Sequence, residues 1–561
     1  MINILILQNA RIGDMLQATP MLSGLKEKYP GCHVTMLANR LFADLRLDPR
    51  LVDEVVYFDQ NGLYEFLQDD AHDLAEKYDH VRAFVDRLGG RRYDLILNLP
   101  SDANNHLLAT ILSARGGEVR GAVYTPDRAL ALKHPSMYLF YTMSEVREFN
   151  RFNLVDLLNL SAGVRPSERR LRLEPSPEGE AFAERFLAGH GVAAGDFLVA
   201  LQPGASEERK RWSPSRFAEL ADALAARFGA RVLLCGSRSE QPLGRQITGL
   251  CRRPLIDAVG RTTLDGLAAL LRRAALLVTN DTGTMHIATA VGTRVIDLSN
   301  GPVYFHETGP YAEGNVVVQG DIECFPCHFT AVCHHLSCRD RITVPMVLRL
   351  AEAVRDGRPP GSLDPREFAG VRVYVSRFND AGRIDFLPAF RYPLTDRELL
   401  SFLYTHMWEA LYGLRAGARP VPELLAEIGK CYDIGDAGAL AGACAGHAAL
   451  FRELSASLGE AITRLRAIQA LGHDPAQAPQ IARLSAEVTA QYEGIILSGR
   501  VQPVLKPLTI HLRLGIDSQE EGTVDRVATG YLEVYESIAG QAQFLTGLLD
   551  AAAAELAVRA A

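Results

Sequence analysis

The chain has 561 residues, of which 48% are hydrophobic and 22% are charged, and its formal net charge is −8. This composition is ordinary for a globular protein, and the length predicts two or three domains because a single core stops growing well below it. The acidic balance excludes a general preference for nucleic acid. No apolar run approaches the ~18 residues of a bilayer span, and no basic leader precedes the first strand. We therefore expect a cytoplasmic protein, free or at the inner face of the inner membrane.

The first domain is expected over residues 1–172. Its apolar patterns predict a strand over 2–7, a helix over 14–28, and further strands at 33–37, 55–58 and 95–97. Strands that alternate with helices are typical of βαβ units, in which the sheet is parallel.

A second α/β domain is expected over residues 173–357. A strand over 197–201 precedes a helix over 214–228, with Ser213 as a plausible N-cap and Pro214 in the first turn. The other predicted elements are strand 232–234, helix 264–271, strand 276–279, helix 284–290, strand 294–298 and a final helix over 344–355.

The third region, residues 365–561, follows a linker of the composition GRPPGSLDP. Two predicted strands flank a turn at 379–382 and indicate a β-hairpin. From Thr395 onward, Ala, Leu and Glu at helical spacing predict an α-helical appendage.

Polar residues follow the strand at 276–279, where Asp281, Thr282 and Gly283 precede a helix. Ligands of parallel sheets bind at the carboxyl ends of the strands, and a helix N-terminus there offers unpaired N–H groups to a phosphate. The alternative is that Asp281 or Thr282 serves as an N-cap.

Two neighbouring strand ends carry further candidates. Lys210 follows the strand at 197–201, and Glu240 follows the strand at 232–234. A lysine neutralises a diphosphate, and a glutamate can accept two hydrogen bonds from a ribose diol. Together these ends suggest a nucleotide-sugar pocket, although Lys210 alone could be a solvated surface lysine. In the first domain, Asp14 follows the first strand and could take a proton from an attacking hydroxyl, or serve as a cap.

Four segments, RIGDMLQATPML, LQPGASEERKRW, CGSRSE and NDTGTMHIATAVGTRVIDL, together resemble the family 9 glycosyltransferases, typified by bacterial ADP-heptose:lipopolysaccharide heptosyltransferases. The resemblance covers about residues 1–357. It implies a GT-B architecture, in which two Rossmann-like domains face a cleft, with the acceptor on the first and the nucleotide-sugar donor on the second.

The resemblance also implies residue roles. Asp14 matches the proposed catalytic base. The donor-binding residues would be Lys210, Glu240, Asp281, Thr282, Gly283 and His286. The implied reaction is an inverting transfer of a sugar, with ADP-heptose as the expected donor and no metal or other cofactor required for catalysis. For His286 the alternative is a histidine buried in helix packing.

Two other functions stay open. One is a nucleotide-sugar epimerase or hydrolase on the same scaffold. The other is a non-catalytic nucleotide-sugar-binding scaffold, in which the helical region carries the function.

A cysteine cluster with the spacing C-x2-C-x5-C-x4-C comprises Cys324, Cys327, Cys333 and Cys338. Four thiolates at such spacing could hold zinc or iron in a tetrahedral structural site, with His328, His334 and His335 as alternative ligands. The alternative is a set of reduced structural thiols.

The acceptor is left open between a glycan or lipid-linked core and a protein, since residues 365–561 extend beyond the compact members of the family. The helical region could also mediate homo-oligomerisation.

Overall fold

The computed structural model describes residues 1–561 except 101, 326, 328–330, 416, 473 and 520. The chain divides into two compact units. Unit 1 comprises residues 1–100, 115–118 and 152–390, and unit 2 comprises residues 101–114, 119–151 and 391–561.

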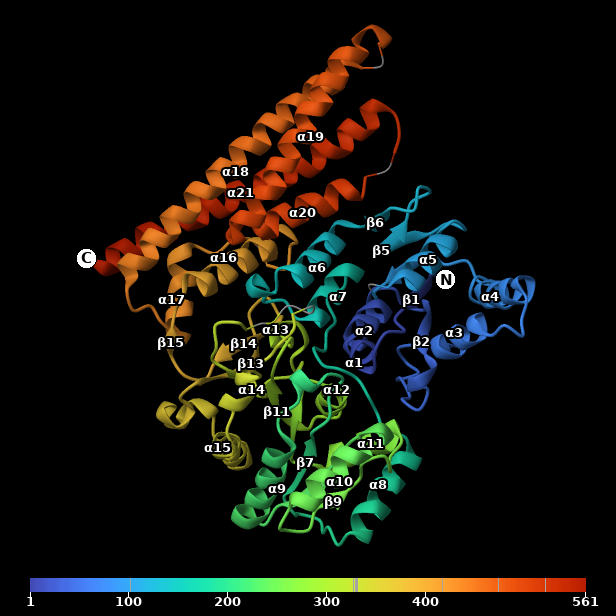
Figure 1. The fold of residues 1–561 in the computed structure, drawn as a ribbon, viewed down its shortest axis with the longest axis vertical. Helices are drawn as coiled ribbons and strands as arrows, with labels where there is room; N and C mark the ends of the chain where they lie inside the picture. The colour runs from blue at the N-terminus through green and yellow to red at the C-terminus, as the bar shows by residue number, and fades with distance from the viewer. Residues whose placement is uncertain (101, 326, 328–330, 416, 473, 520) are drawn as a thin grey trace. The chain divides into compact units, whose positions relative to one another are not determined.

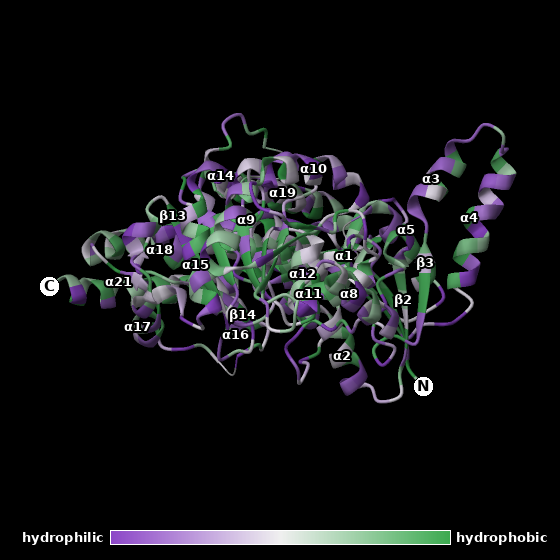
Figure 2. Cartoon of the chain, turned by 90° about the horizontal axis from the view of Figure 1, so that it is seen from below, coloured by the Kyte–Doolittle hydropathy of each residue, from purple (hydrophilic) through white to green (hydrophobic). Residues whose placement is uncertain are grey.

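Unit 1 begins with four parallel strands, paired in the order β3-β2-β1-β4. Their bounds are β1 (Asn3–Leu7), β2 (His33–Asn39), β3 (Glu54–Phe58) and β4 (Leu95–Asn98). The accompanying helices are α1 (Ile12–Gln17), α2 (Thr19–Lys28), α3 (Gln60–Gln68), α4 (Leu74–Leu88) and α7 (Leu154–Ala162). Figure 2 shows the hydrophobic colour of β2 and β3 beside the mixed colours of α4, most of whose residues are exposed.

The helix expected over 14–28 is two helices, which corrects the prediction. Ala18 separates α1 from α2, and Pro20 lies in the first turn of α2. Proline has no N–H to donate to the preceding turn, so the helix restarts there. The Thr19 hydroxyl instead donates to the carbonyl of Leu16, at 2.6 Å.

The second sheet of unit 1 has eight strands in the order β14-β13-β12-β11-β10-β7-β8-β9. The parallel strands are β7 (Leu198–Gln202), β8 (Arg231–Leu234), β9 (Ile256–Asp257), β10 (Leu276–Asn280), β11 (Arg294–Ser299) and β12 (Val316–Gly320). The hairpin β13 (Val371–Phe378) and β14 (Ile384–Pro388) adds antiparallel strands beside β12. The sequence groups this hairpin with the helical region, whereas it completes the second sheet; the domain boundaries themselves stay a prediction.

Helices flank this sheet, and β10 is buried along its whole length, as expected of a central parallel strand. The helices are α8 (Pro177–Gly189), α9 (Pro214–Phe228), α10 (Gln241–Leu250), α11 (Leu264–Arg273), α12 (Gly283–Ala290), α13 (Phe305–Thr308), α14 (Ser337–Arg341) and α15 (Val344–Arg355). Ser213 occupies the predicted N-cap position of α9, but its hydroxyl contacts that of Ser215. It makes no capping hydrogen bond to the backbone, so the prediction is right in position and wrong in the hydrogen bond.

Unit 2 is mostly helical (Figure 1). Its elements are α5 (Ala103–Ser113), β5 (Glu118–Tyr124), β6 (Leu130–Lys133), α6 (Pro135–Glu145), β15 (Tyr392–Pro393), α16 (Asp396–Leu411), α17 (Val421–Cys431), β16 (Tyr432–Asp433), α18 (Ala437–Leu471), α19 (Ala478–Val501), α20 (Lys506–Asp517) and α21 (Val524–Ala560). The long helices α18 and α21 run antiparallel, since Arg452 pairs with Asp550 and Arg466 with Glu536.

Buried residues on α18 recur every three or four positions, from Leu440 through Cys444, Ala448 and Phe451 to Leu454. This spacing places them on one face of the helix, which packs against α21. None of the helices in the described part of the chain has the length and hydropathy of a bilayer span. Two sheets with flanking helices and a helical C-terminal region confirm the expected GT-B class with an α-helical extension.

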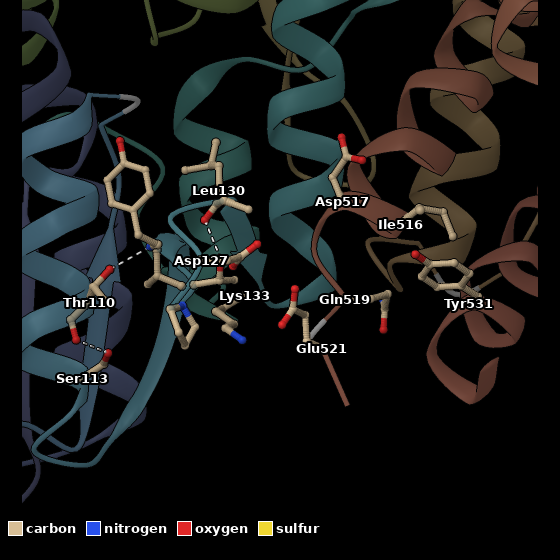
Figure 3. A pocket seen from close by; sticks show the side chains of 15 residues that line it. Thr110, Ser113, Asp127, Leu130, Lys133, Ile516, Asp517, Gln519, Glu521 and Tyr531 are labelled. Atoms are coloured by element: carbon tan, nitrogen blue, oxygen red, sulfur yellow. Dashed lines mark hydrogen bonds between the residues drawn. The ribbon is translucent and has the colours of Figure 1, made fainter. Parts of the chain in front are cut away.

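Unit 2 also contains a cavity of 780 Å³ between the β5–β6 hairpin and the ends of α20 and α21 (Figure 3). Asp127, Asp517 and Glu521 contribute three carboxyl groups to its lining, against the single ammonium group of Lys133. The lining of this cavity therefore carries more carboxyl groups than cationic groups.

Candidate active site

The N-terminal ends of α1 and α12 pack directly against each other within unit 1. A Cβ atom at Gly13 would lie 2.7 Å from Cδ2 of His286, and one at Gly283 would lie 2.2 Å from Cγ2 of Ile12. Both positions therefore require glycine, because any side chain would separate the helices. The RIGD segment of the first sheet and the DTG segment of the second are thereby brought together.

Asp14 lies in the first turn of α1, where Arg11 rather than Asp14 occupies the N-cap position. Burial raises the pKa of Asp14 to about 6, against the opposing charge and backbone hydrogen bond of Arg11. The negative charge of Asp281 raises this pKa further. A carboxyl group with this pKa is poised to act as a base near neutral pH.

Lys210 follows β7 and is 8% exposed, so its reading as a solvated surface lysine is wrong. Its Nζ lies 4.0 Å from Oδ2 of Asp281, which follows β10. Thr282 occupies the N-cap position of α12 without a capping hydrogen bond. A cation and a helix N-terminus are thus placed at neighbouring strand ends, an arrangement that suits an anionic ligand.

Glu240 lies against the glycine turn that follows β7. A Cβ atom at Gly204 would lie 1.5 Å from Oε1 of Glu240, so the carboxylate fills the space that a larger residue would need. Its Oε2 accepts the backbone N–H of Ser237 at 2.7 Å. The ends of β7 and β8 therefore meet at this carboxylate.

Asn280, which the sequence did not single out as a functional residue, connects two of these loops. Its Oδ1 accepts the backbone N–H of Trp212 at 2.9 Å, and its Nδ2 donates to the carbonyl of Pro203 at 2.8 Å. Asn280 immediately precedes Asp281, so these bonds fasten the start of the DTG segment to the loop that follows β7. The sequence signal that could have found it is an amide at the end of a mostly apolar strand.

His286 lies on α12 with 4% of its surface exposed, and its Nδ1 has no hydrogen-bond partner among the described residues. Burial lowers the pKa of His286 to about 4. The imidazole is consequently neutral at physiological pH and can donate one ring N–H.

Asp297, in the middle of β11, is a second residue that the sequence did not single out. It is fully buried, and neither carboxyl oxygen has a hydrogen-bond partner in the part of the chain that the structure describes. Burial raises its pKa well above the ordinary value, the charge of Asp281 raises it further, and Lys210 lowers it. A carboxyl group within the apolar run VIDL is the feature of the sequence that could have identified this residue. In its neutral form Asp297 adds no negative charge beside Lys210.

Replacing Asp297 by asparagine should flatten the pH dependence of stability. Because the folded-state pKa of Asp297 is raised, its contribution to stability is fully present below the unfolded pKa of about 3.9 and is lost as pH rises toward the folded value, by about 1.4 kcal/mol per pH unit. The variant should therefore gain stability relative to the wild type as pH rises above about 4. Urea unfolding at several pH values measures this difference.

Asp156→Asn is the matched control. The carboxylate of Asp156 is buried but accepts hydrogen bonds from the Tyr311 hydroxyl at 2.9 Å and from the N–H of Ile384 at 3.2 Å. Its loss should destabilise the protein across the same pH range. Parallel pH profiles for the wild type and Asp297→Asn would contradict the assignment.

The four cysteines differ in exposure, from the exposed Cys324 to the buried Cys338. Burial raises the pKa of Cys327, and the charges of Cys324, Cys338 and Cys333 raise it further, so the thiols are neighbours. Among the described residues, no group of three or more metal-ligating side chains is placed to hold an ion. His328, one of the alternative ligands, lies outside the described residues.

Comparison with known proteins finds similar sequences and structures. Residues 81–335 match "Glycosyltransferase family 9 (heptosyltransferase)". The chain is 26% identical to lipooligosaccharide heptosyltransferase 2 of Haemophilus influenzae over 330 residues, which cover 56% of this chain and 88% of that protein. It is 29% identical to lipopolysaccharide heptosyltransferase 3 of Escherichia coli over 293 residues, covering 51% of this chain and 80% of that protein.

A family 9 glycosyltransferase from Veillonella parvula has a crystal structure with a TM-score of 0.49 to this chain and 21% identity, covering 63% of this chain and 97% of that one. The sequence relatives, together with two α/β sheets whose strand ends meet near Lys210 and Asp281, define this protein as a glycosyltransferase. Over residues 81–335 the chain is similar to glycosyltransferase family 9.

Proposed function

We propose that this glycosyltransferase transfers heptose from ADP-heptose to a hydroxyl group of a glycan acceptor in one inverting displacement. The sugar is supported by the sequence relatives, which are named as heptosyltransferases of lipooligosaccharide and lipopolysaccharide. The nucleotide is the one that the family resemblance of the sequence implies.

The contact between α1 and α12 carries the proposal. It places the Asp14 carboxyl group within electrostatic reach of Asp281, and the Asp281 carboxylate lies beside Lys210. The proposed base and the proposed diphosphate-binding group, which come from two different sheets, would thus share one site. Transfer requires this arrangement, since the acceptor hydroxyl and the donor must meet.

In the proposed reaction, Asp14 removes the proton of the acceptor hydroxyl as its oxygen attacks the anomeric carbon of the donor. The bond from that carbon to the diphosphate breaks, and its electron pair leaves with the nucleoside diphosphate. The ammonium group of Lys210 and the N-terminus of α12 stabilise the negative charge on the departing phosphate. Neutral His286 can add one hydrogen bond. Glu240 would hold the ribose hydroxyls of the nucleotide.

Further parts of the proposal concern residues outside this pocket. A structural zinc or iron ion at the four cysteines stays a prediction, since no such group of ligands is found among the described residues, and no step of the transfer passes through it. A protein acceptor and homo-oligomerisation through the helical region stay as alternatives to a glycan acceptor and a single chain.

Thermal-shift measurements with ADP, UDP and GDP test the donor part of the proposal. ADP at a hundred times its dissociation constant should stabilise the protein by about 2.7 kcal/mol, and the other nucleotides should stabilise it less. Incubation with ADP-heptose and a heptose-accepting core oligosaccharide should then release ADP and yield the extended glycan. A stronger response to UDP or GDP would contradict ADP-heptose as the donor.

The same assay separates the alternative functions. A hydrolase or epimerase would consume the donor at the same rate without acceptor, whereas a transferase would depend on it. Binding without turnover in the presence of any acceptor would favour a non-catalytic scaffold.

A further inference from the structure

Trp212 forms hydrogen bonds in two directions from the loop that carries Lys210. Its backbone N–H donates to Oδ1 of Asn280, the residue before Asp281, at 2.9 Å. Its indole Nε1–H donates to the carbonyl of Ile342 at 2.9 Å. Because the side chain is 1% exposed, both bonds are shielded from water. Trp212 therefore joins the donor pocket to the chain that follows α14.

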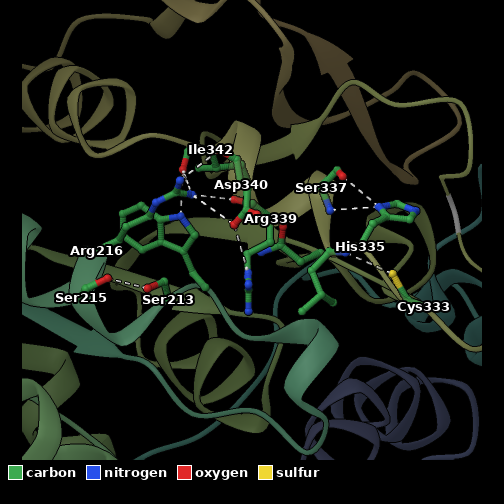
Figure 4. A network of polar contacts seen from close by, with 12 residues as sticks. Ser213, Ser215, Arg216, Cys333, His335, Ser337, Arg339, Asp340 and Ile342 are labelled. Carbon is green, nitrogen blue, oxygen red and sulfur yellow. Dashed lines mark hydrogen bonds and ion pairs between the residues drawn. The ribbon is translucent and has the colours of Figure 1, made fainter.

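Arg216, in the first turn of α9, makes a second connection to the same place (Figure 4). Its Nη1 donates to the carbonyls of Arg339 at 3.0 Å and Ile342 at 2.9 Å, and its Nη2 donates to the carbonyl of Asp340 at 3.1 Å. These carbonyls end α14, where backbone acceptors lack helical partners and a cation is favourable. The guanidinium group therefore binds the end of α14 to α9.

The segment reached by these bonds, residues 331–342, carries two of the four cysteines. Cys338 is buried in α14, and Sγ of Cys333 accepts the N–H of Leu336 at 3.4 Å. A third bond runs from the Arg209 guanidinium to the carbonyl of Ala331. Arg209 precedes Lys210 in the short turn Glu208–Lys210, which has no side-chain cap of its own. The position of Lys210 therefore depends on neighbours that are bound to the cysteine-bearing segment.

We propose that Trp212 and Arg216 are positioning residues that couple segment 331–342 to the donor pocket, so that the conformation of this segment sets the affinity for the nucleoside diphosphate. The inference rests on the proposed function and extends it to regulation of the same pocket. In the proposed arrangement neither side chain contacts the donor, and each acts through Lys210 and Asp281.

The test compares Arg216→Gln with Arg227→Gln, two substitutions on the same helix. Arg227 lies near the other end of α9 and pairs with Glu352 of α15 at 2.8 Å, so it also fastens α9 to a neighbour but away from the pocket. Arg216→Gln should raise the Kd for ADP, measured by calorimetry, by roughly tenfold, and Arg227→Gln should leave it unchanged. Arg216→Lys, which keeps the charge without the planar fork, should fall between them.

Trp212→Phe provides a second variant that keeps the buried ring and removes only the indole donor. It should raise the Kd for ADP by a few-fold. Trp212 and Arg216 donate hydrogen bonds to the same Ile342 carbonyl. The double variant Trp212→Phe/Arg216→Gln should therefore raise the Kd for ADP by less than the product of the two single increases.

Coupling is reciprocal, so ADP should also act on the segment. Hydrogen exchange of residues 331–342 should slow when ADP binds to the wild type and should not respond in Arg216→Gln. Equal Kd values for ADP in the wild type, Arg216→Gln and Trp212→Phe would overturn the inference and leave the proposed function intact. A wild type that binds no nucleoside diphosphate would overturn the proposed function, and the coupling with it.

Discussion

Replacing Asp14 by asparagine is expected to lower the rate of sugar transfer by roughly 10³-fold, because general-base catalysis contributes about 10²–10⁴ to such reactions. The affinity for ADP should change little, since Asp14 acts on the acceptor. Asparagine has nearly the shape of aspartate, so the close packing of Gly13 on His286 should persist. Single-turnover assays with saturating donor measure the chemical step directly.

The dependence of kcat/KM on pH tests whether Asp14 acts as the base. The base must be ionised, and burial raises the pKa of Asp14 to about 6. The wild-type kcat/KM should therefore fall about tenfold per pH unit below pH 6 and level off above it. This limb should be absent from the residual activity of Asp14→Asn. Asp79→Asn, at an exposed position on α4, is the control and should keep the wild-type profile. Full activity in Asp14→Asn would eliminate Asp14 as the base.

Replacing Lys210 by methionine should lower kcat/KM by about a hundredfold, the usual loss when one preorganised group that stabilises transition-state charge is removed. Methionine keeps much of the buried aliphatic volume of lysine, so the effect reports charge rather than packing. The Kd for ADP should rise as well, because the ammonium group would contact the diphosphate in both ground and transition states.

Lys430→Met, at an exposed position on α17, is the control for this substitution and should leave both parameters unchanged. An unchanged Kd for ADP in Lys210→Met, with kcat/KM within a few-fold of the wild type, would place the diphosphate elsewhere.

Local patterns predicted most of the elements that build the candidate site. The strand at 276–279 and the helix at 284–290 are observed within one residue of their expected limits, because apolar runs bounded by polar turns constrain short α/β elements. The approach of Gly13 to His286 was beyond the sequence alone. The resemblance to a GT-B family implied that the two motifs face each other, but periodicity within a segment carries no information about contacts across 270 residues.

Other features depend on long-range pairing that no local pattern encodes. The hairpin at 371–388 was foreseen as a hairpin, but its union with β12 depends on main-chain hydrogen bonds to a distant strand. Asp297 shows a different limit. Its strand was foreseen, yet the significance of its carboxyl group depends on Lys210 and Asp281 lying beside it.

Unit 2 combines segments from early and late parts of the chain, which affects folding during synthesis. Residues 101–114 and 119–151 pack with residues 391–561, and Leu132 donates its N–H to the Ser518 hydroxyl across 386 positions of the chain. Arg513 of α20 likewise pairs with Glu145 of α6. During translation, the apolar surface of α6 must wait for roughly 360 further residues before its partner α20 leaves the ribosome, about 20–70 s at typical elongation rates. Early segments of this enzyme thus depend on its last helices, and a truncated chain would leave them uncovered.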